Sequence, residues 1–113
     1  MVVDDSPRII EAFENACKDH YHVISTTEGE KALELIPLEQ PELVVLDWRL
    51  NGFVEGKDVL LFLKRQYPHI PVYVVTASFN AVKEIESLGA DACLLKPCAD
   101  LFDRIKTALP PEQ

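Results

Sequence analysis

Five short apolar runs alternate with amphipathic stretches along the chain, and this alternation limits the folds open to it more than any other feature. The runs are rich in β-branched residues and are bounded by proline, glycine or charged residues, as strands are. The third run, Leu43 to Leu46, carries no polar residue, which is typical of a strand buried on both faces. The five runs cover residues 1–3, 21–25, 43–46, 72–75 and 92–95.

Strict alternation of strands and helices predicts an α/β fold in a single domain. Strands of this kind pair in parallel, and their helical crossovers cover both faces of the sheet. Five strands and five helices fit a flavodoxin-like, doubly wound (βα)5 sandwich, with a five-stranded parallel sheet in the order 2-1-3-4-5. We expect the domain to span residues 1–109, with residues 110–113 as a linker start or C-terminal tail.

Local signals predict several helix ends. Ser6 followed by Pro7 indicates an N-cap with proline at the first helical position. Thr27 with Glu30 three residues later has the spacing of a capping box. Pro37 is expected to begin the loop after the second helix, because proline cannot donate a backbone hydrogen bond.

Charge and cysteine content exclude several classes of function. Acidic residues outnumber basic ones by 19 to 11, for a net charge of −8, so this chain is not expected to bind nucleic acid directly. No apolar run approaches the ~20 residues of a membrane helix, and the N-terminus lacks the pattern of a signal peptide. The three cysteines, Cys17, Cys93 and Cys98, form no C-x-x-C pair, which favours a reduced, cytoplasmic setting.

Polar residues interrupt the apolar pattern where the predicted strands end. Asp4 and Asp5 follow the first strand, Asp47 the third, Thr76 the fourth and Lys96 the fifth. The carboxyl ends of parallel strands share one edge of the sheet, where ligands bind. Each residue alone has an ordinary structural explanation, such as a helix start, a turn or a solvated lysine. Their joint placement predicts a cleft with three carboxylates, a hydroxyl and an ammonium group.

Such a cleft suits phosphoryl transfer. Three close carboxylates repel one another, and a hard cation such as Mg²⁺ relieves the repulsion while accepting phosphate oxygens. Lys96 offers a positive charge and Thr76 a hydrogen bond to phosphoryl oxygens. One carboxylate remains as a nucleophile that can form an acyl phosphate.

The chain resembles the receiver domain of two-component response regulators, in the CheY-like superfamily, over essentially its whole length. The resemblance lies in an acidic pair, a phosphoacceptor segment, a hydroxyl segment and a two-part signature around the fifth strand. These segments are residues 2–6, 46–49, 74–77, 89–91 and 94–97.

The resemblance implies a role for each site residue. Asp47 would take the phosphoryl group, and Thr76 and Lys96 would contact it. Asp5 is the expected direct metal ligand of the acidic pair. The implied Mg²⁺ ligands are Asp4, Asp5, Asp47 and the backbone carbonyl of Arg49.

The chain also departs from the family pattern. Cys93 stands where the family usually has Tyr or Phe, so the aromatic part of the switch would be missing or altered. The loop 50–56 lacks the common Met-Pro pair and is one residue longer before its glycine. Arg49 and Ser78 occupy positions that tune the hydrolysis of the acyl phosphate in the family. The bond before Pro97 is expected to be cis.

As a receiver domain the chain would be a phosphoacceptor with autodephosphorylation, and not a turnover enzyme. Its implied partners are a sensor histidine kinase or phosphotransfer protein and a downstream protein or effector domain, and homodimers are common in the family. A haloacid-dehalogenase-type phosphatase needs a second acid where Arg49 stands, and a nucleotide-binding domain needs a glycine-rich loop after the first strand. The remaining alternative is an interaction module that keeps the fold but signals without phosphorylation.

Overall fold

A single parallel sheet forms the centre of the protein. The computed structural model describes residues 1–110. The strands are β1 (Val2–Val3), β2 (Ser25–Thr26), β3 (Val44–Asp47), β4 (Val72–Thr76) and β5 (Ala92–Leu95). Every pairing is parallel, and the order is β2-β1-β3-β4-β5, which confirms the predicted topology. All carboxyl ends of the strands therefore lie at one edge of the sheet.

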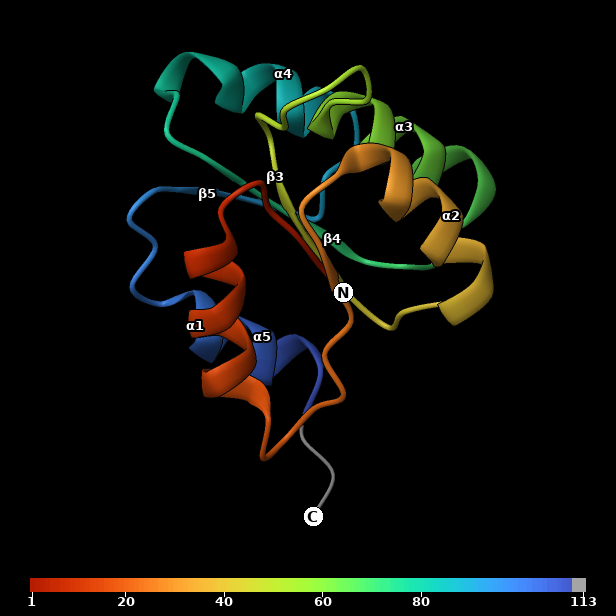
Figure 1. The fold of residues 1–113 in the computed structure, drawn as a ribbon. Helices are drawn as coiled ribbons and strands as arrows, with labels where there is room; N and C mark the ends of the chain where they lie inside the picture. Colours follow the sequence, from red (N-terminus) through yellow and green to blue (C-terminus); the bar gives the residue numbers. More distant parts are fainter. Residues whose placement is uncertain (111–113) are drawn as a thin grey trace.

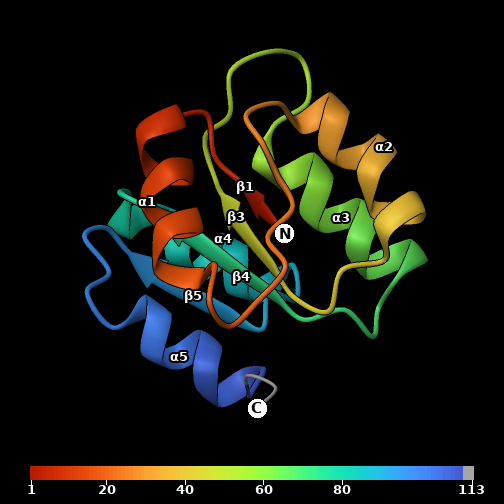
Figure 2. The ribbon, with the colours of Figure 1, turned by 60° about the horizontal axis from the view of Figure 1, so that its bottom comes forward.

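Helices cover both faces of this sheet (Figures 1 and 2). One face carries α1 and α5, and the other carries α2, α3 and α4. A short 3-10 helix, η1, leads directly into α4. The helices are α1 (Pro7–Cys17), α2 (Gly29–Glu39), α3 (Gly56–Gln66), η1 (Phe79–Ala81), α4 (Val82–Ser87) and α5 (Leu101–Ala108).

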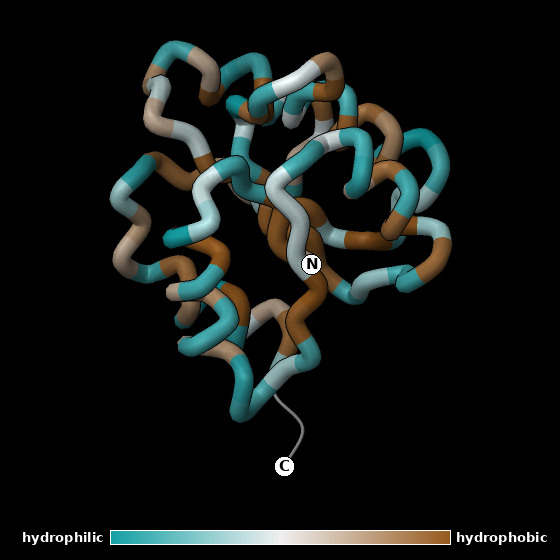
Figure 3. The backbone as a smooth tube through the Cα atoms, in the orientation of Figure 1, coloured by the Kyte–Doolittle hydropathy of each residue, from teal (hydrophilic) through white to brown (hydrophobic). Residues whose placement is uncertain are grey.

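The alternation of side chains along the central strands divides the core into two layers. Leu46 and Val74 lie in the larger layer, beneath α2, α3 and α4. Val45 and Val75 point to the other face, where they pack with Ile105 of α5. Hydrophobic residues therefore concentrate in the middle of the molecule (Figure 3). Because β3 is buried on both faces, the residue at its end has a well-fixed position.

All five predicted strands and all five predicted helices are present, but the second strand and the second helix differ in detail. The second strand is only Ser25–Thr26, since its run is at the sheet edge and pairs with β1 alone. The prediction of a capping box at Thr27 and Glu30 was wrong. The N-cap residue of α2 is Glu28, and the Glu30 side chain accepts a hydrogen bond from the Val54 N–H instead of capping its own helix. Pro37 does not end α2, because Gln40 still donates its N–H to the Ile36 carbonyl at 2.9 Å.

The N-cap at Ser6 is confirmed, with Pro7 as the first residue of α1. The predicted linker or tail at residues 110–113 falls mostly on 111–113, which lie outside the described residues. Within residues 1–110, no helix is long and apolar enough to cross a bilayer.

Candidate functional site

Three carboxylates meet at the carboxyl edge of the sheet. Asp4 and Asp5 follow β1, and Asp47 is the last residue of β3, the neighbouring strand. One carboxylate oxygen from each lies within 4.8 Å of the others. Asp4 and Asp47 are each only 5% exposed, while Asp5 is half-buried. Burying acids together is costly unless a cation joins them, so this cluster is a candidate cation site.

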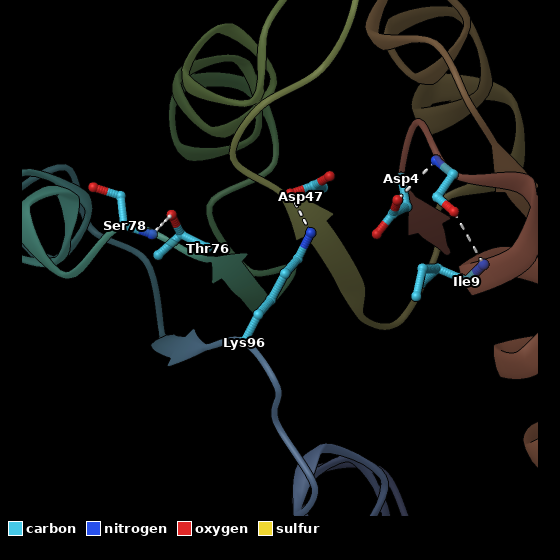
Figure 4. Close-up of polar contacts among 7 residues, drawn as sticks. Asp4, Ile9, Asp47, Thr76, Ser78 and Lys96 are labelled. Carbon is cyan, nitrogen blue, oxygen red and sulfur yellow. Dashed lines mark hydrogen bonds and ion pairs between the residues drawn. The ribbon is translucent and has the colours of Figure 1, made fainter.

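Backbone hydrogen bonds hold the Asp4 carboxylate and the main chain that carries Asp47 in place. The Ser6 N–H donates to Asp4 Oδ1 at 2.9 Å, just where Ser6 caps α1 (Figure 4). The Trp48 N–H donates to the Val75 carbonyl at 3.0 Å, which extends the pairing of β3 and β4 past Asp47. Asp4 therefore has one oxygen already engaged, and the backbone on both sides of Asp47 is fixed.

Lys96 supplies the positive charge of the site. Lys96 follows β5. Its backbone N–H donates to the Thr76 carbonyl at 2.9 Å, which holds the Lys96 main chain beside β4. Its side chain reaches back across the strand ends, and Nζ lies 3.2 Å from Asp47 Oδ1 (Figure 4). This is a charge-assisted hydrogen bond to a buried acceptor.

Thr76 and Ser78 lie on the other side of Asp47 from Asp4 (Figure 4). Thr76 is 2% exposed, and its Oγ1 accepts a hydrogen bond from the Ser78 N–H at 3.0 Å. An open pocket of about 380 Å³ lies over these groups. The side chains that line it include Asp5, Asp47, Arg49, Thr76, Ser78 and Lys96. Six of the residues singled out from the sequence therefore share one pocket.

Burial and mutual repulsion raise the pKa of two acids. For Asp47, burial raises the pKa most and the nearby Asp4 raises it further, while Lys96 lowers it. For Asp4, burial again raises the pKa most, and the Ser6 N–H and Lys96 oppose the effect. Ionisation of both carboxyl groups is therefore disfavoured in the metal-free protein, and Lys96 offsets this only in part.

These shifts predict a pH-dependent stability of the metal-free protein. Because the folded pKa of Asp47 is raised, its stabilising contribution is complete below the unfolded value near 3.8 and is lost as pH rises through the folded value. In EDTA at pH 7.5, Asp47→Asn should increase the free energy of unfolding by about 1 kcal/mol, and the gain should vanish near pH 4. Urea unfolding at both pH values measures this. A variant less stable than wild type at pH 7.5 would contradict it.

The donor set fits Mg²⁺. All three side chains offer carboxylate oxygen, the ligand that this hard cation prefers, and the open pocket leaves room for water and phosphate oxygens. Within residues 1–110, no His or Cys joins the cluster, so the site does not have the nitrogen and sulfur donors typical of zinc. A carboxylate beside a candidate cation site and an ammonium group is an arrangement that can support phosphoryl transfer.

Comparison with known proteins decides the family. Residues 1–109 match the family model of the response regulator receiver domain. The chain belongs to this family. It is also 36% identical over 115 residues to the alkaline phosphatase synthesis transcriptional regulatory protein PhoP of Bacillus subtilis. That alignment covers 96% of this receiver domain but only 47% of PhoP, so the chain spans about half the length of its curated relative.

Solved receiver structures have the same fold. The BeF3-activated N-terminal receiver domain of RstA from Klebsiella pneumoniae is 28% identical, with a TM-score of 0.85 and 96% of each chain covered. The response regulator TrrA from Thermotoga maritima, in complex with Mg²⁺-BeF, is 25% identical, with a TM-score of 0.84 and 96% of each chain covered. The chain is therefore the receiver domain of a two-component response regulator.

The remaining predicted residues fall into two groups. Arg49 and Ser78 line the pocket, and the Lys96–Pro97 peptide bond is cis, as predicted. Cys93 lies elsewhere: it is half-buried on β5 and packs against the larger core layer. The contact of Glu30 with the loop after Asp47 was not predicted, because the spacing of Glu30 from Thr27 suggested a capping box instead.

Proposed function

We propose that this receiver domain accepts a phosphoryl group on Asp47 in a Mg²⁺-dependent reaction. The observation that carries the proposal is the position of the Asp47 carboxylate, which is buried between the Lys96 ammonium at 3.2 Å and the acidic pair. The Mg²⁺ complex of the relative TrrA supports the choice of cation. Like other receiver domains, the chain acts as a phosphoacceptor and not as a turnover enzyme.

The reaction is an in-line displacement. An Asp47 carboxylate oxygen attacks phosphorus and forms an acyl phosphate bond, while the bond from phosphorus to the donor breaks and the donor keeps its electron pair. Asp4, Asp5, Asp47 and the Arg49 carbonyl would hold Mg²⁺, which would supply positive charge to neutralise the phosphoryl oxygens. Lys96 Nζ already lies at the carboxylate, so it needs little movement to donate to a phosphoryl oxygen.

Intact mass spectrometry tests this proposal. The protein is incubated with acetyl phosphate with and without Mg²⁺, beside an Asp47→Asn variant. We expect the wild type to gain one phosphoryl group only with Mg²⁺ and to lose it in mild base, and the variant to gain none. A wild type that stays unmodified at saturating Mg²⁺ contradicts the proposal.

Thr76 would couple phosphorylation of Asp47 to a conformational change in the segment that leads into η1 and α4. In the unphosphorylated state its hydroxyl oxygen accepts from the Ser78 N–H, just before η1 and α4. A hydroxyl that turns to donate to the phosphoryl group would release this N–H and free the backbone at Ser78. Arg49 and Ser78, which line the pocket, would then set how easily water reaches the acyl phosphate.

A Thr76→Val variant separates phosphorylation from this response. Valine keeps the shape but removes the hydroxyl and its one hydrogen bond, so the variant should accept the phosphoryl group within about tenfold of the wild-type rate. Its amide hydrogen exchange between Ser78 and Ser87 should not change on phosphorylation, whereas that of the wild type should. An equal change in both proteins would show that the hydroxyl does not carry the signal.

Partners follow from the proposed reaction. The phosphodonor would be a sensor histidine kinase or phosphotransfer protein, and the responder a downstream protein or effector domain. The relative PhoP is named a transcriptional regulatory protein, which supports an effector beyond the receiver domain in proteins of this type. The acidic charge of this chain argues against direct contact with nucleic acid. A second copy of this chain is a further candidate partner, and measuring the oligomeric state with and without phosphorylation would test it.

Cys93 favours a second candidate function, an interaction module that signals without phosphorylation. Its small side chain packs into the core, where the family pattern has an aromatic residue that changes rotamer. A protein that fails the acetyl phosphate test but still binds a partner would support this second function.

A further inference from the structure

The loop between β3 and α3, residues 48–55, is held by a contact from α2. Glu30 lies in the first turn of α2, but its side chain does not cap that helix. Its Oε1 instead accepts a hydrogen bond from the Val54 N–H at 2.9 Å, 24 residues further along the chain. The first turn of α2 is therefore fastened to the loop that follows Asp47.

Two glycines allow this close approach. Gly52 has a φ of +104°, a conformation that favours glycine, and a Cβ there would lie 3.2 Å from Glu30 Oε1. Gly29 packs so tightly on the Val54 carbonyl that any side chain would clash with it. The Glu30 carboxylate thus lies directly over the left-handed turn of the loop.

The end of the loop packs closely against the end of β3, the strand that carries Asp47. A Cβ on Gly56, the first residue of α3, would lie 2.5 Å from the Asp47 carbonyl oxygen. Glu55 and Asp58 form a capping box that starts α3, with the Glu55 N–H donating to Asp58 Oδ2 at 2.9 Å. Arg49, the expected carbonyl ligand, lies in the stretch between Asp47 and the Glu30 contact.

We propose that Glu30 is a positioning residue for the cation site, acting through its hydrogen bond to Val54. The inference rests on the proposed function, because it concerns the same Mg²⁺ site. The loop lacks a rigid Met-Pro pair, so its residues would otherwise have to be ordered when the cation binds. A contact that orders the loop beforehand removes this entropy cost and strengthens binding.

The test measures Mg²⁺ affinity in matched variants through the fluorescence of Trp48, which adjoins Asp47. Glu30→Ala removes the hydrogen bond, while Glu30→Gln removes the charge but keeps an acceptor oxygen. Glu34→Ala is the control, because it removes an exposed charge from the same helix. We expect Glu30→Ala to weaken binding about fivefold and the other two variants to stay within about twofold of wild type.

Hydrogen exchange of the metal-free proteins gives a second readout. Glu30→Ala should speed exchange in residues 50–55, and Glu30→Gln should not. If Glu30→Ala lowers the melting temperature but binds Mg²⁺ like wild type, the positioning role is wrong. If Glu30→Gln loses as much affinity as Glu30→Ala, charge and not the hydrogen bond is responsible, and the inference also fails. A wild type that binds no Mg²⁺ would instead overturn the proposed function.

Discussion

An Asp5→Asn variant is expected to bind Mg²⁺ at least about a hundredfold more weakly than the wild type. Asp5 lines the open pocket with Asp47, whereas Asp4 is more buried and has one oxygen engaged by the Ser6 N–H. Asp5 is therefore the carboxylate best placed to ligate a cation directly. Titration of Trp48 fluorescence measures the affinity, and the rate of phosphorylation by acetyl phosphate at fixed Mg²⁺ should fall with it.

Asp19→Asn is the matched control for this change. Asp19 is exposed beyond the C-terminal end of α1, away from the strand ends that carry the site. Its variant removes the same formal charge and should keep wild-type affinity. If both variants lost affinity equally, overall charge would explain the effect, and the assignment of Asp5 as a ligand would be wrong.

A Lys96→Met variant should lose about a hundredfold or more in the rate of phosphorylation. Its ammonium group is the cation that the structure places on Asp47, at 3.2 Å, and methionine keeps much of the length of the side chain without the charge. The reaction builds negative charge on phosphoryl oxygens, so loss of this donor acts on the transition state. Initial rates of acyl phosphate formation at saturating Mg²⁺ measure the loss.

The same variant should bind Mg²⁺ as well as the wild type or better. Lys96 lowers the pKa of Asp47 and competes with a metal ion for its negative charge, so removing it leaves a more negative site. Slower phosphorylation with undiminished Mg²⁺ binding would separate a role in phosphoryl transfer from damage to the fold. A parallel loss of both properties would contradict this division of roles. Lys31→Met, on the exposed surface of α2, is the control.

Sequence reasoning succeeds at this site because parallel strands bring distant residues to one edge. Asp4, Asp47, Thr76 and Lys96 each end an apolar run, and the strand order alone makes the residues after β1 and β3 neighbours. The run before Asp47 is buried on both faces, so its pattern leaves little doubt about where the strand ends. The ends of β1, β3, β4 and β5 and the site residues at those ends could therefore be predicted together, whereas the edge strand β2 was predicted less accurately.

Contacts that depend on side-chain direction were harder to predict. Thr27 and Glu30 have the spacing of a capping box. The Glu30 side chain instead accepts a hydrogen bond from the Val54 N–H, in a loop that is close in space but far along the sequence. Pro37 lacks a backbone N–H and so removes one hydrogen bond from α2. The helix still continues to Glu39, because Ile36 is buried in the core and the Gln40 N–H donates to the Ile36 carbonyl. Tertiary packing overrides the local signal in both cases.

The central claim is that the phosphoryl group resides on Asp47, and chemical location of that group tests it most directly. The protein is phosphorylated with acetyl phosphate and Mg²⁺, reduced with borohydride, digested and sequenced by mass spectrometry. Reduction converts an aspartyl phosphate to homoserine, so the account predicts homoserine at position 47 and at no other aspartate. Homoserine at Asp4 or Asp5 with aspartate intact at position 47, or no homoserine in a protein that had gained phosphoryl mass, would contradict it.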